Sequence, residues 1–218
     1  MSLRIGLDMD GVLADFRTAF HQCAERCLKR DVTTGGSPGS GETLAAGDVK
    51  QVWDYIGRTP NWWMEVKPYE PEQISRLHDL TRELGWEVFF LTKRPPSAGD
   101  TVQFQTQSWL ERHGFYLPSV LTVPGSRGEV ANGLRLDIVV DDLILNCVEI
   151  VSASPSKAML MLREPHPPTR KHATERGIGV IVTLAESIDV FERLQQTLPE
   201  RRGRLMRLAD WFTSPKAE

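Results

Sequence analysis

Six short apolar runs alternate along this chain with segments of helical spacing, and this alternation limits the possible folds more than any other feature. The runs, several of them rich in Val, Ile or Phe, are Leu3–Leu7, Glu87–Leu91, Ser119–Val123, Asp137–Val140, Ala158–Leu162 and Gly179–Thr183. The segments of helical spacing are Glu70–Leu84, Val102–His113, Leu143–Val151 and Ala185–Leu198. Buried strands that alternate with helices predict an α/β fold, a Rossmann-like parallel sheet with helices on both faces.

One interval is longer than a single crossover between strands requires. Between the first strand and Glu87 lie a helix from about Phe16 to Lys29, a loop and a Trp-rich segment. We therefore predict a helical cap over residues 16–68, inserted after the first strand into a core made of residues 1–15 and 69–199. The glycine-rich loop 33–47 within the cap is either a lid or a passive linker.

Composition excludes several classes of partner. The net charge of −3 over 218 residues gives no broad basic field, so a large nucleic-acid partner is disfavoured. No apolar run approaches the roughly 20 residues that cross a bilayer, and we expect a cytoplasmic protein without a membrane partner. The basic, amphipathic extension over residues 200–218 is expected to dock on its own domain or on a second subunit in a homodimer.

Two aspartates, Asp8 and Asp10, directly follow the first apolar run. Residues two apart in such a loop can point the same way, at the edge where parallel sheets place their ligands. Two carboxylates this close repel each other unless a cation is present, and their hard oxygen atoms favour magnesium. Asp8 could then attack a phosphorus atom, while Asp10 protonates the leaving oxygen and later deprotonates water. The alternative is an ordinary Asp-Gly turn after a strand.

A polar segment also follows the strand that ends at Leu91. The Thr92 hydroxyl and nearby backbone N–H groups could bind phosphate, and Lys93 or Arg94 could add positive charge. Of these two cations we select Lys93 as a phosphate-binding residue, together with Thr92. Polar residues are common after strands, so this segment carries little weight by itself.

Two adjacent acids, Asp141 and Asp142, close the fourth predicted strand. Such a pair at the end of a buried strand is costly unless it is solvated or bound to a metal. We favour a metal. The alternative is a helix start from Leu143 onward that one of the acids caps, and the two roles can coexist.

Together these segments resemble the haloacid dehalogenase-like superfamily over about residues 3–183. Its phosphatases carry an Asp-x-Asp pair, a strand-end Thr or Ser, a basic residue and a terminal acidic pair in that order. More narrowly, the chain is similar to the 5′(3′)-deoxyribonucleotidase family and its bacterial relatives. The segments that carry this narrower resemblance are Asp8–Phe16, Trp53–Tyr55, the Trp62–Trp63 region, Leu91–Pro95 and Val140–Asp142.

The resemblance implies a role for each matched residue. Asp8 would be the nucleophile and a magnesium ligand, and Asp10 the acid/base with its backbone carbonyl on the metal. Thr92 would hold the phosphoryl oxygens. Asp142 would be the direct magnesium ligand at the terminal pair, with Asp141 in a supporting role. Because dehalogenases lack an Asp at the position of Asp10, phosphate-ester chemistry is favoured.

The sequence departs from the family at the basic residue. The family places a Lys before the acidic pair, and the best position in this chain offers Arg127. An arginine can bind phosphate through two hydrogen bonds, yet it is bulkier than lysine and differently shaped. Arg127 is therefore either the phosphate-binding cation or a surface residue, with Lys93 and Lys157 as alternative cations.

Aromatic residues of the predicted cap are candidates for contact with a substrate. In the family, rings from the inserted helices pack on the nucleobase, and we select Phe16, Trp62 and Trp63, with Trp53 and Tyr55 as further candidates. A place in the apolar core of the cap is the more common fate of any one such ring. Trp62 and Trp63 are adjacent, so in a helix they point in different directions and one of them would face the cleft.

The sequence thus predicts a magnesium-dependent phosphomonoesterase that forms an aspartyl-phosphate. The expected substrate is a small phosphorylated molecule, with a (deoxy)nucleoside monophosphate favoured. A sugar phosphate or phosphoglycolate is the alternative substrate, and a weakly active nucleotide-binding or interaction protein is the alternative of another class.

Overall fold

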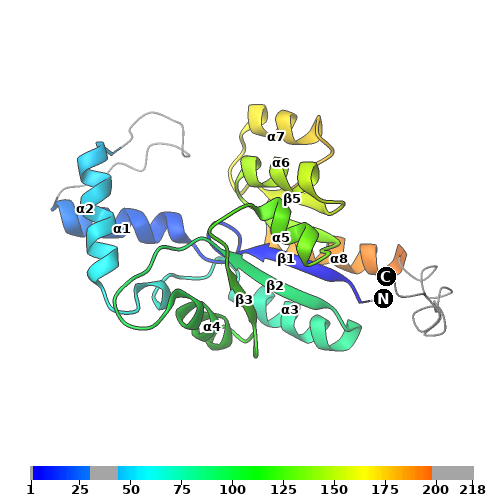
Figure 1. Ribbon diagram of the computed structural model, residues 1–218, viewed down its shortest axis with the longest axis horizontal. Helices are drawn as coiled ribbons and strands as arrows, with labels where there is room; N and C mark the ends of the chain where they lie inside the picture. Colours follow the sequence, from blue (N-terminus) through cyan, green and yellow to red (C-terminus); the bar gives the residue numbers. More distant parts are fainter. Residues whose placement is uncertain (1, 30–43, 198–218) are drawn as a thin grey trace, which may run out of the picture.

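A parallel six-stranded sheet forms the centre of the molecule (Figure 1). The computed structural model describes residues 2–29 and 44–197, and in it the strands follow the order β3-β2-β1-β4-β5-β6. Their bounds are β1 Arg4–Asp8, β2 Glu87–Thr92, β3 Ser119–Thr122, β4 Ile138–Asp141, β5 Lys157–Met161 and β6 Gly179–Ile181. Each strand falls on one of the six apolar runs, so the predicted Rossmann-like α/β sheet is confirmed.

Helices cover both faces of the sheet, because successive side chains along a strand point to opposite faces. In β4, Ile138 and Val140 pack into one apolar cluster, whereas Val139 packs into a second. The first cluster includes residues of α3 (Pro71–Leu84), α4 (Val102–Arg112) and α8 (Leu184–Thr197). The second includes residues of α5 (Arg127–Gly133), α6 (Ile144–Ala153) and α7 (Pro167–Thr174).

The order of the strands brings three strand ends together. β1 lies between β2 and β4, with Asp8 in register with Leu91 and Leu7 in register with Val140. All three strands run parallel, so the segments that follow Asp8, Thr92 and Asp141 leave the same edge of the sheet. Ligands of open parallel sheets bind at this edge.

Two helices, α1 (Phe16–Leu28) and α2 (Ala46–Arg58), and a short 3₁₀ turn, η1 (Trp62–Met64), occupy the interval where we predicted a cap. Figure 1 shows α1 and α2 packed together beyond the carboxyl edge of the sheet. The two ends of the interval are hydrogen-bonded side by side. The Asp15 N–H donates to the Lys67 carbonyl at 2.8 Å, and the Tyr69 N–H donates to the Leu13 carbonyl at 2.9 Å.

Part of the predicted cap lies outside the described residues. Of the loop 33–47 the structure describes only residues 44–47, and Ala46 and Gly47 already belong to α2, so the predicted loop extends two residues too far. The extension over residues 200–218 also lies outside the described part of the chain. Within that part, no helix combines the length and the apolar character that a membrane crossing requires.

Candidate active site

Asp8, Asp10 and Asp142 come together where the chain leaves β1. Asp8 is the last residue of the strand and is 8% exposed. The turn after Asp10 places Gly11 at a φ of +82°, a backbone conformation that glycine adopts without strain. A Cβ atom on Gly11 would lie 2.1 Å from Oδ2 of Asp142, so the loop backbone passes directly against that carboxylate. Glycine at this position is what allows the two acidic segments to approach.

Arg127 brings positive charge into this acidic cluster. Its Nη2 donates to Oδ1 of Asp8 at 2.5 Å, and its Nε lies 3.6 Å from Oδ2 of Asp141. The residue begins α5, where the Ser126 hydroxyl accepts from the Glu129 N–H and caps the helix. Arg127 is 5% exposed, and its Nη1 has no hydrogen-bond partner among the described residues. The surface alternative for Arg127 is therefore wrong.

Burial and mutual repulsion favour the neutral forms of these acids. Desolvation, and next the negative charge of Asp141, raise the pKa of Asp8, and Arg127 opposes the rise. Burial also raises the pKa of Asp141, against hydrogen bonds from the Leu143 N–H and the Asn146 amide. The pKa of Asp142 rises to about 7 through burial and the charges of Asp141 and Asp10. The cluster therefore has more negative charge than Arg127 alone can compensate.

Thr92 and Arg94 turn toward the site, whereas Lys93 turns away. Thr92 ends β2 and is 1% exposed, and its Oγ1 accepts from the Arg94 N–H at 3.4 Å. Lys93 is exposed and forms no hydrogen bond or ion pair with residues that the structure describes, so its phosphate-binding role stays a prediction. The buried cation of this loop is Arg94, which our selection of site residues omitted. The period of two along an extended chain was the available signal, since it places residues 92 and 94 on the same side.

Arg94 binds the carboxylate of Asp10 through two nitrogens. Its Nε donates to Oδ2 at 2.9 Å and to Oδ1 at 3.2 Å, and its Nη2 donates to Oδ1 at 2.8 Å. The Arg94 side chain is fully buried, whereas that of Asp10 is 23% exposed. The acid that we predicted as the proton donor thus has a fixed ionic partner.

The fold has relatives among solved structures, although neither a protein-family model nor a curated protein sequence matches the chain. A haloacid dehalogenase-like hydrolase from Streptococcus pneumoniae aligns with a TM-score of 0.56 at 11% identity, over 87% of this chain and 98% of its own. A protein from Thermotoga maritima, provisionally named a beta-phosphoglucomutase, aligns with a TM-score of 0.54 at 16% identity, over 88% and 99%. The chain has a haloacid dehalogenase-like fold.

At this level of identity the comparisons concern the fold. A third relative, a haloacid dehalogenase-like hydrolase from Xanthomonas campestris, has a TM-score of 0.50 at 13% identity over 91% of this chain and 98% of its own. The predicted resemblance to the superfamily is confirmed at the level of the fold. The narrower resemblance to deoxyribonucleotidases is not shown by these relatives and stays a prediction.

The acids of this site fit a magnesium ion. Among the described residues, no group of three His, Cys, Asp or Glu side chains is arranged to hold a metal. The predicted ligand set does not require one, because it combines the Asp8 and Asp142 carboxylates with the backbone carbonyl of Asp10. All these donors are oxygen atoms. Burial, and next the charges of neighbouring acids, raise the pKa of Asp8 and of Asp142, and a divalent cation would oppose both rises. The metal roles of Asp8, Asp10, Asp141 and Asp142 remain predictions.

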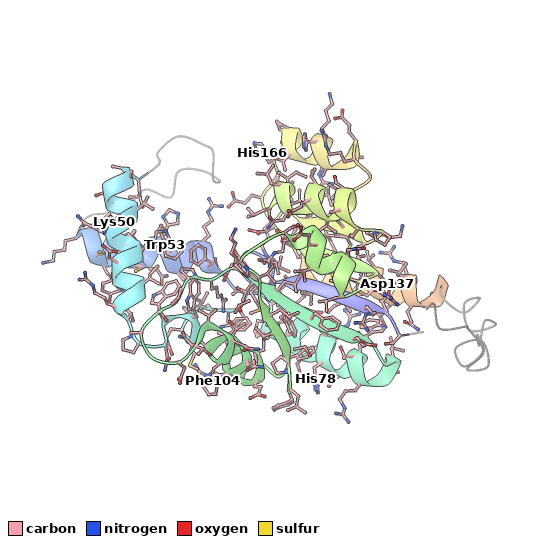
Figure 2. All side chains as sticks on the ribbon, viewed as in Figure 1. Lys50, Trp53, His78, Phe104, Asp137 and His166 are labelled. Carbon is pink, nitrogen blue, oxygen red and sulfur yellow. The ribbon has the colours of Figure 1, made fainter. Side chains whose placement is uncertain are left out.

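Four aromatic rings pack against one another at the base of the cap. Phe16 stacks on Trp53 and on Trp63, each at 5.8 Å between ring centroids, and meets the edge of Trp62 at 6.2 Å. Trp53 comes from α2 on the cap side of the cluster (Figure 2). Trp63 is only 1% exposed and Trp62 9%, so the expectation that one of the pair faces the cleft is wrong.

Contacts of η1 with α4 and with the segment after β2 explain the burial of both tryptophans. The Trp63 N–H donates to the Gln105 side chain and its indole Nε1 donates to the Pro95 carbonyl, which holds the ring against the core. Trp62 packs edge-on against Trp63 at 4.8 Å. Phe16 is half-buried, so of the three predicted substrate contacts it keeps the most free surface.

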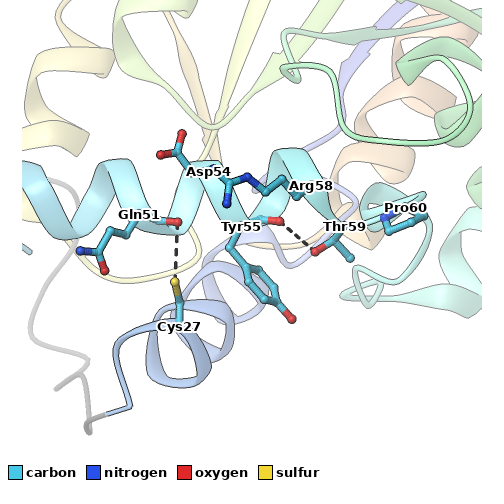
Figure 3. A pocket seen from close by; sticks show the side chains of 7 residues that line it. All are labelled: Cys27, Gln51, Asp54, Tyr55, Arg58, Thr59 and Pro60. Atoms are coloured by element: carbon cyan, nitrogen blue, oxygen red, sulfur yellow. Dashed lines mark hydrogen bonds between the residues drawn. The ribbon is translucent and has the colours of Figure 1, made fainter.

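A surface hollow formed by described residues lies elsewhere. It has a volume of about 460 Å³ and is lined by Cys27 of α1 and by residues of α2 and the segment that follows it (Figure 3). None of the acids or arginines of the site lines this hollow. The site after β1, with the raised pKa values of Asp8, Asp141 and Asp142 and with its buried ion pairs, is therefore the better candidate for chemistry.

Proposed function

We propose that this protein is a magnesium-dependent phosphomonoesterase that transfers the phosphoryl group to Asp8. The observation that carries the proposal is the buried Asp8–Arg127 pair, in which Nη1 of Arg127 has no acceptor within the described ranges 2–29 and 44–197. A buried, unpaired donor beside a buried carboxylate suits a ligand that presents several anionic oxygens to the guanidinium group. A phosphoryl group has this character.

The residues of the site divide the steps of the proposed reaction among them. An oxygen of Asp8 attacks phosphorus, and the bond from phosphorus to the leaving oxygen breaks. Arg127 and Thr92 donate hydrogen bonds to the phosphoryl oxygens. Asp10 gives its proton to the leaving oxygen and then accepts a proton from the water that releases phosphate from Asp8. Magnesium held by Asp8, the Asp10 carbonyl and Asp142, with Asp141 beside them, would neutralise part of the phosphoryl charge.

A (deoxy)nucleoside monophosphate is the substrate that we favour. The aromatic cluster at the base of the cap supports this choice, because Phe16 retains a partly free ring that could contact a base. A sugar phosphate is the second candidate, and the Thermotoga maritima relative supports it, since its provisional name denotes a sugar-phosphate enzyme. Turnover measured on deoxynucleotides and on sugar phosphates with magnesium distinguishes the two.

Replacement of Asp8 tests the chemical step. We expect Asp8→Asn to abolish magnesium-dependent phosphate release from p-nitrophenyl phosphate, because an amide oxygen is a poor nucleophile at phosphorus. Asp137→Asn is the matched control. Asp137 lies at the opposite end of the sheet (Figure 2), where its carboxylate accepts from the Arg4 N–H, and this variant should keep its activity. Full activity of Asp8→Asn would refute the mechanism.

A further inference from the structure

Arg94 is held by contacts with three side chains, and one of them is the carboxylate of Asp10. Beyond its two-nitrogen contact with Asp10, its Nη1 donates to the Thr106 hydroxyl at 3.2 Å. Its guanidinium carbon lies 4.7 Å from the centroid of the Trp63 ring, a cation–π contact that burial strengthens. Both neighbours are themselves fixed, Thr106 by a hydrogen bond to the Val102 carbonyl and Trp63 by its bond to Pro95. Arg94 therefore has little freedom to move.

The two carboxylate oxygens of Asp10 accept different numbers of hydrogen bonds from Arg94. Oδ1 accepts two hydrogen bonds from Arg94, at 2.8 and 3.2 Å, whereas Oδ2 accepts one, at 2.9 Å. A carboxylate oxygen has two lone pairs, so Oδ2 keeps one for a proton while Oδ1 has none to spare. The guanidinium group also prevents rotation of the carboxylate, because both oxygens are bound to one planar group.

We propose that Arg94 is the positioning residue for proton transfer and that Oδ2 of Asp10 carries the proton. This inference rests on the proposed function. In the first step Oδ2 gives its proton to the leaving oxygen as that oxygen separates from phosphorus and Asp8 becomes phosphorylated. In the second step Oδ2 takes a proton from water as the water oxygen bonds to phosphorus and the bond from phosphorus to Asp8 breaks. Arg94 touches no reacting atom and acts through Asp10.

Two substrates separate this role from a merely structural one. p-Nitrophenyl phosphate has a leaving group that is stable as an anion and needs no proton, whereas the alkoxide of glycerol phosphate does need one. In rapid-mixing experiments with magnesium, we expect Arg94→Met to slow the first turnover of glycerol phosphate by about 10- to 100-fold. The first turnover of p-nitrophenyl phosphate should change by no more than about threefold. These bounds lie within the contribution of a typical general acid–base group.

The second step supplies an independent signature. Because water activation also needs a positioned Asp10, Arg94→Met should show a burst of nitrophenol followed by slow turnover. Phosphorylated Asp8 should accumulate and be trapped by acid quenching. Arg94→Lys keeps the charge but loses the two-nitrogen contact, so the same pattern is expected. Thr106→Val removes the Nη1 acceptor and the hydroxyl's bond to Val102 but leaves the Asp10 contact in place, so it should show a smaller effect in the same direction.

Arg76→Met is the matched control, because Arg76 binds Asp189 and Glu192 of α8 and contacts none of the site residues. Arg76→Met should not slow the first turnover of one substrate more than that of the other. Equal first-turnover losses on both substrates in the Arg94 and Thr106 variants, without a burst, would overturn the inference. Unchanged kinetics in the Arg94 variants would also overturn the inference. A wild-type protein that released phosphate from no phosphomonoester would instead contradict the proposed function itself.

Discussion

Arg127 compensates only part of the charge that the fold buries around it. Asp8 and Asp141 both lie within ion-pair distance of this one guanidinium group. Asp142 lies against Gly11, in the loop that follows Asp8 and Asp10. Burying carboxylates without sufficient positive charge favours their neutral forms. The stability of the metal-free protein should therefore depend on pH in a direction opposite to that of an ordinary salt-bridged acid.

Asp142 gives the clearest prediction, because its folded pKa of about 7 exceeds its usual value of 3.8. Between these values the folded state binds more protons at Asp142 than the unfolded state does, so the free energy of unfolding falls as pH rises toward 7. In EDTA, we expect the melting temperature of the wild type to rise relative to that of Asp142→Asn, by at least about 3 °C, when pH falls from 7.5 to 5.5.

The comparison with Asp142→Asn removes the titrations of groups that do not interact with Asp142. Burial, and then the charge of Arg112, lower the pKa of His113, and a depressed histidine pKa costs stability as pH falls. His113 is present in both proteins, so its contribution cancels in the difference. Magnesium should reduce the difference, because it favours the ionised acid. A wild type that lost stability relative to Asp142→Asn at pH 5.5 would contradict the pKa assignment.

Among the individual residues, a position directly after a predicted strand was a better guide to the site than the type of residue was. Asp8, Thr92 and Asp141 were selected because each ends an apolar run, and the structure brings the three strand ends to one edge. Arg94 was passed over in favour of Lys93, because both are cations and only the direction of the side chain distinguishes them. Trp63 was selected as a candidate substrate contact. The hydrogen bonds to Gln105 and Pro95 that bury it depend on distant parts of the chain, so the local sequence does not reveal them.

Two of the helices that sequence periodicity missed, α5 and α7, are short. α5 and α7 contribute few buried apolar side chains, with Ala131 in α5 and Ala173 in α7, so they carry little helical pattern. α5 nevertheless positions Arg127, and it does so by close packing on α6. A Cβ atom at Gly128 would lie 2.6 Å from the Glu149 carbonyl oxygen and 2.7 Å from Cβ of Ala153.

A methyl group at Gly128 should therefore separate α5 from α6. We expect Gly128→Ala to destabilise the fold by about 1–3 kcal/mol, as overpacking does, and to lower kcat because Arg127 is displaced. Gly133→Ala is the matched control on the same helix, since a Cβ atom there meets nothing within 4 Å. Thermal unfolding and phosphatase assays check both. Equal melting temperatures for the two variants would show that α5 is not packed as described.

At the scale of the whole molecule, Arg163 joins segments that are distant in the sequence. Its Nε and Nη2 donate to the carbonyls of Gly11 and Val12 at 3.1 and 2.6 Å, and its Nη1 donates to Glu70 at 2.9 Å. Glu70 in turn accepts from the Leu184 N–H at the start of α8. One side chain thus connects the loop after Asp10, the return from the cap and the last described helix.

Loss of this connection should loosen the loop that carries Asp10. We expect Arg163→Met to cost about 1–3 kcal/mol of stability, because several buried carbonyl and carboxylate acceptors lose their donor. Hydrogen exchange should become faster at the N–H groups of residues 11–14. Arg170→Met, at an exposed position of α7, serves as control and should change neither quantity. Unchanged exchange in Arg163→Met would show that the loop is held by its own turn alone.

The paired ends of the cap interval have a consequence for how such a protein can diversify. The interval begins at Asp15, whose N–H is hydrogen-bonded to Lys67 at the other end of the interval. The antiparallel bridge between Ala14 and Pro68 lies next to this bond. An insertion whose two ends meet closes its own gap and leaves the strands below undisturbed. The cap can then be exchanged as a cassette, so substrate range could evolve by replacement of one segment while the acids beneath it are inherited unchanged.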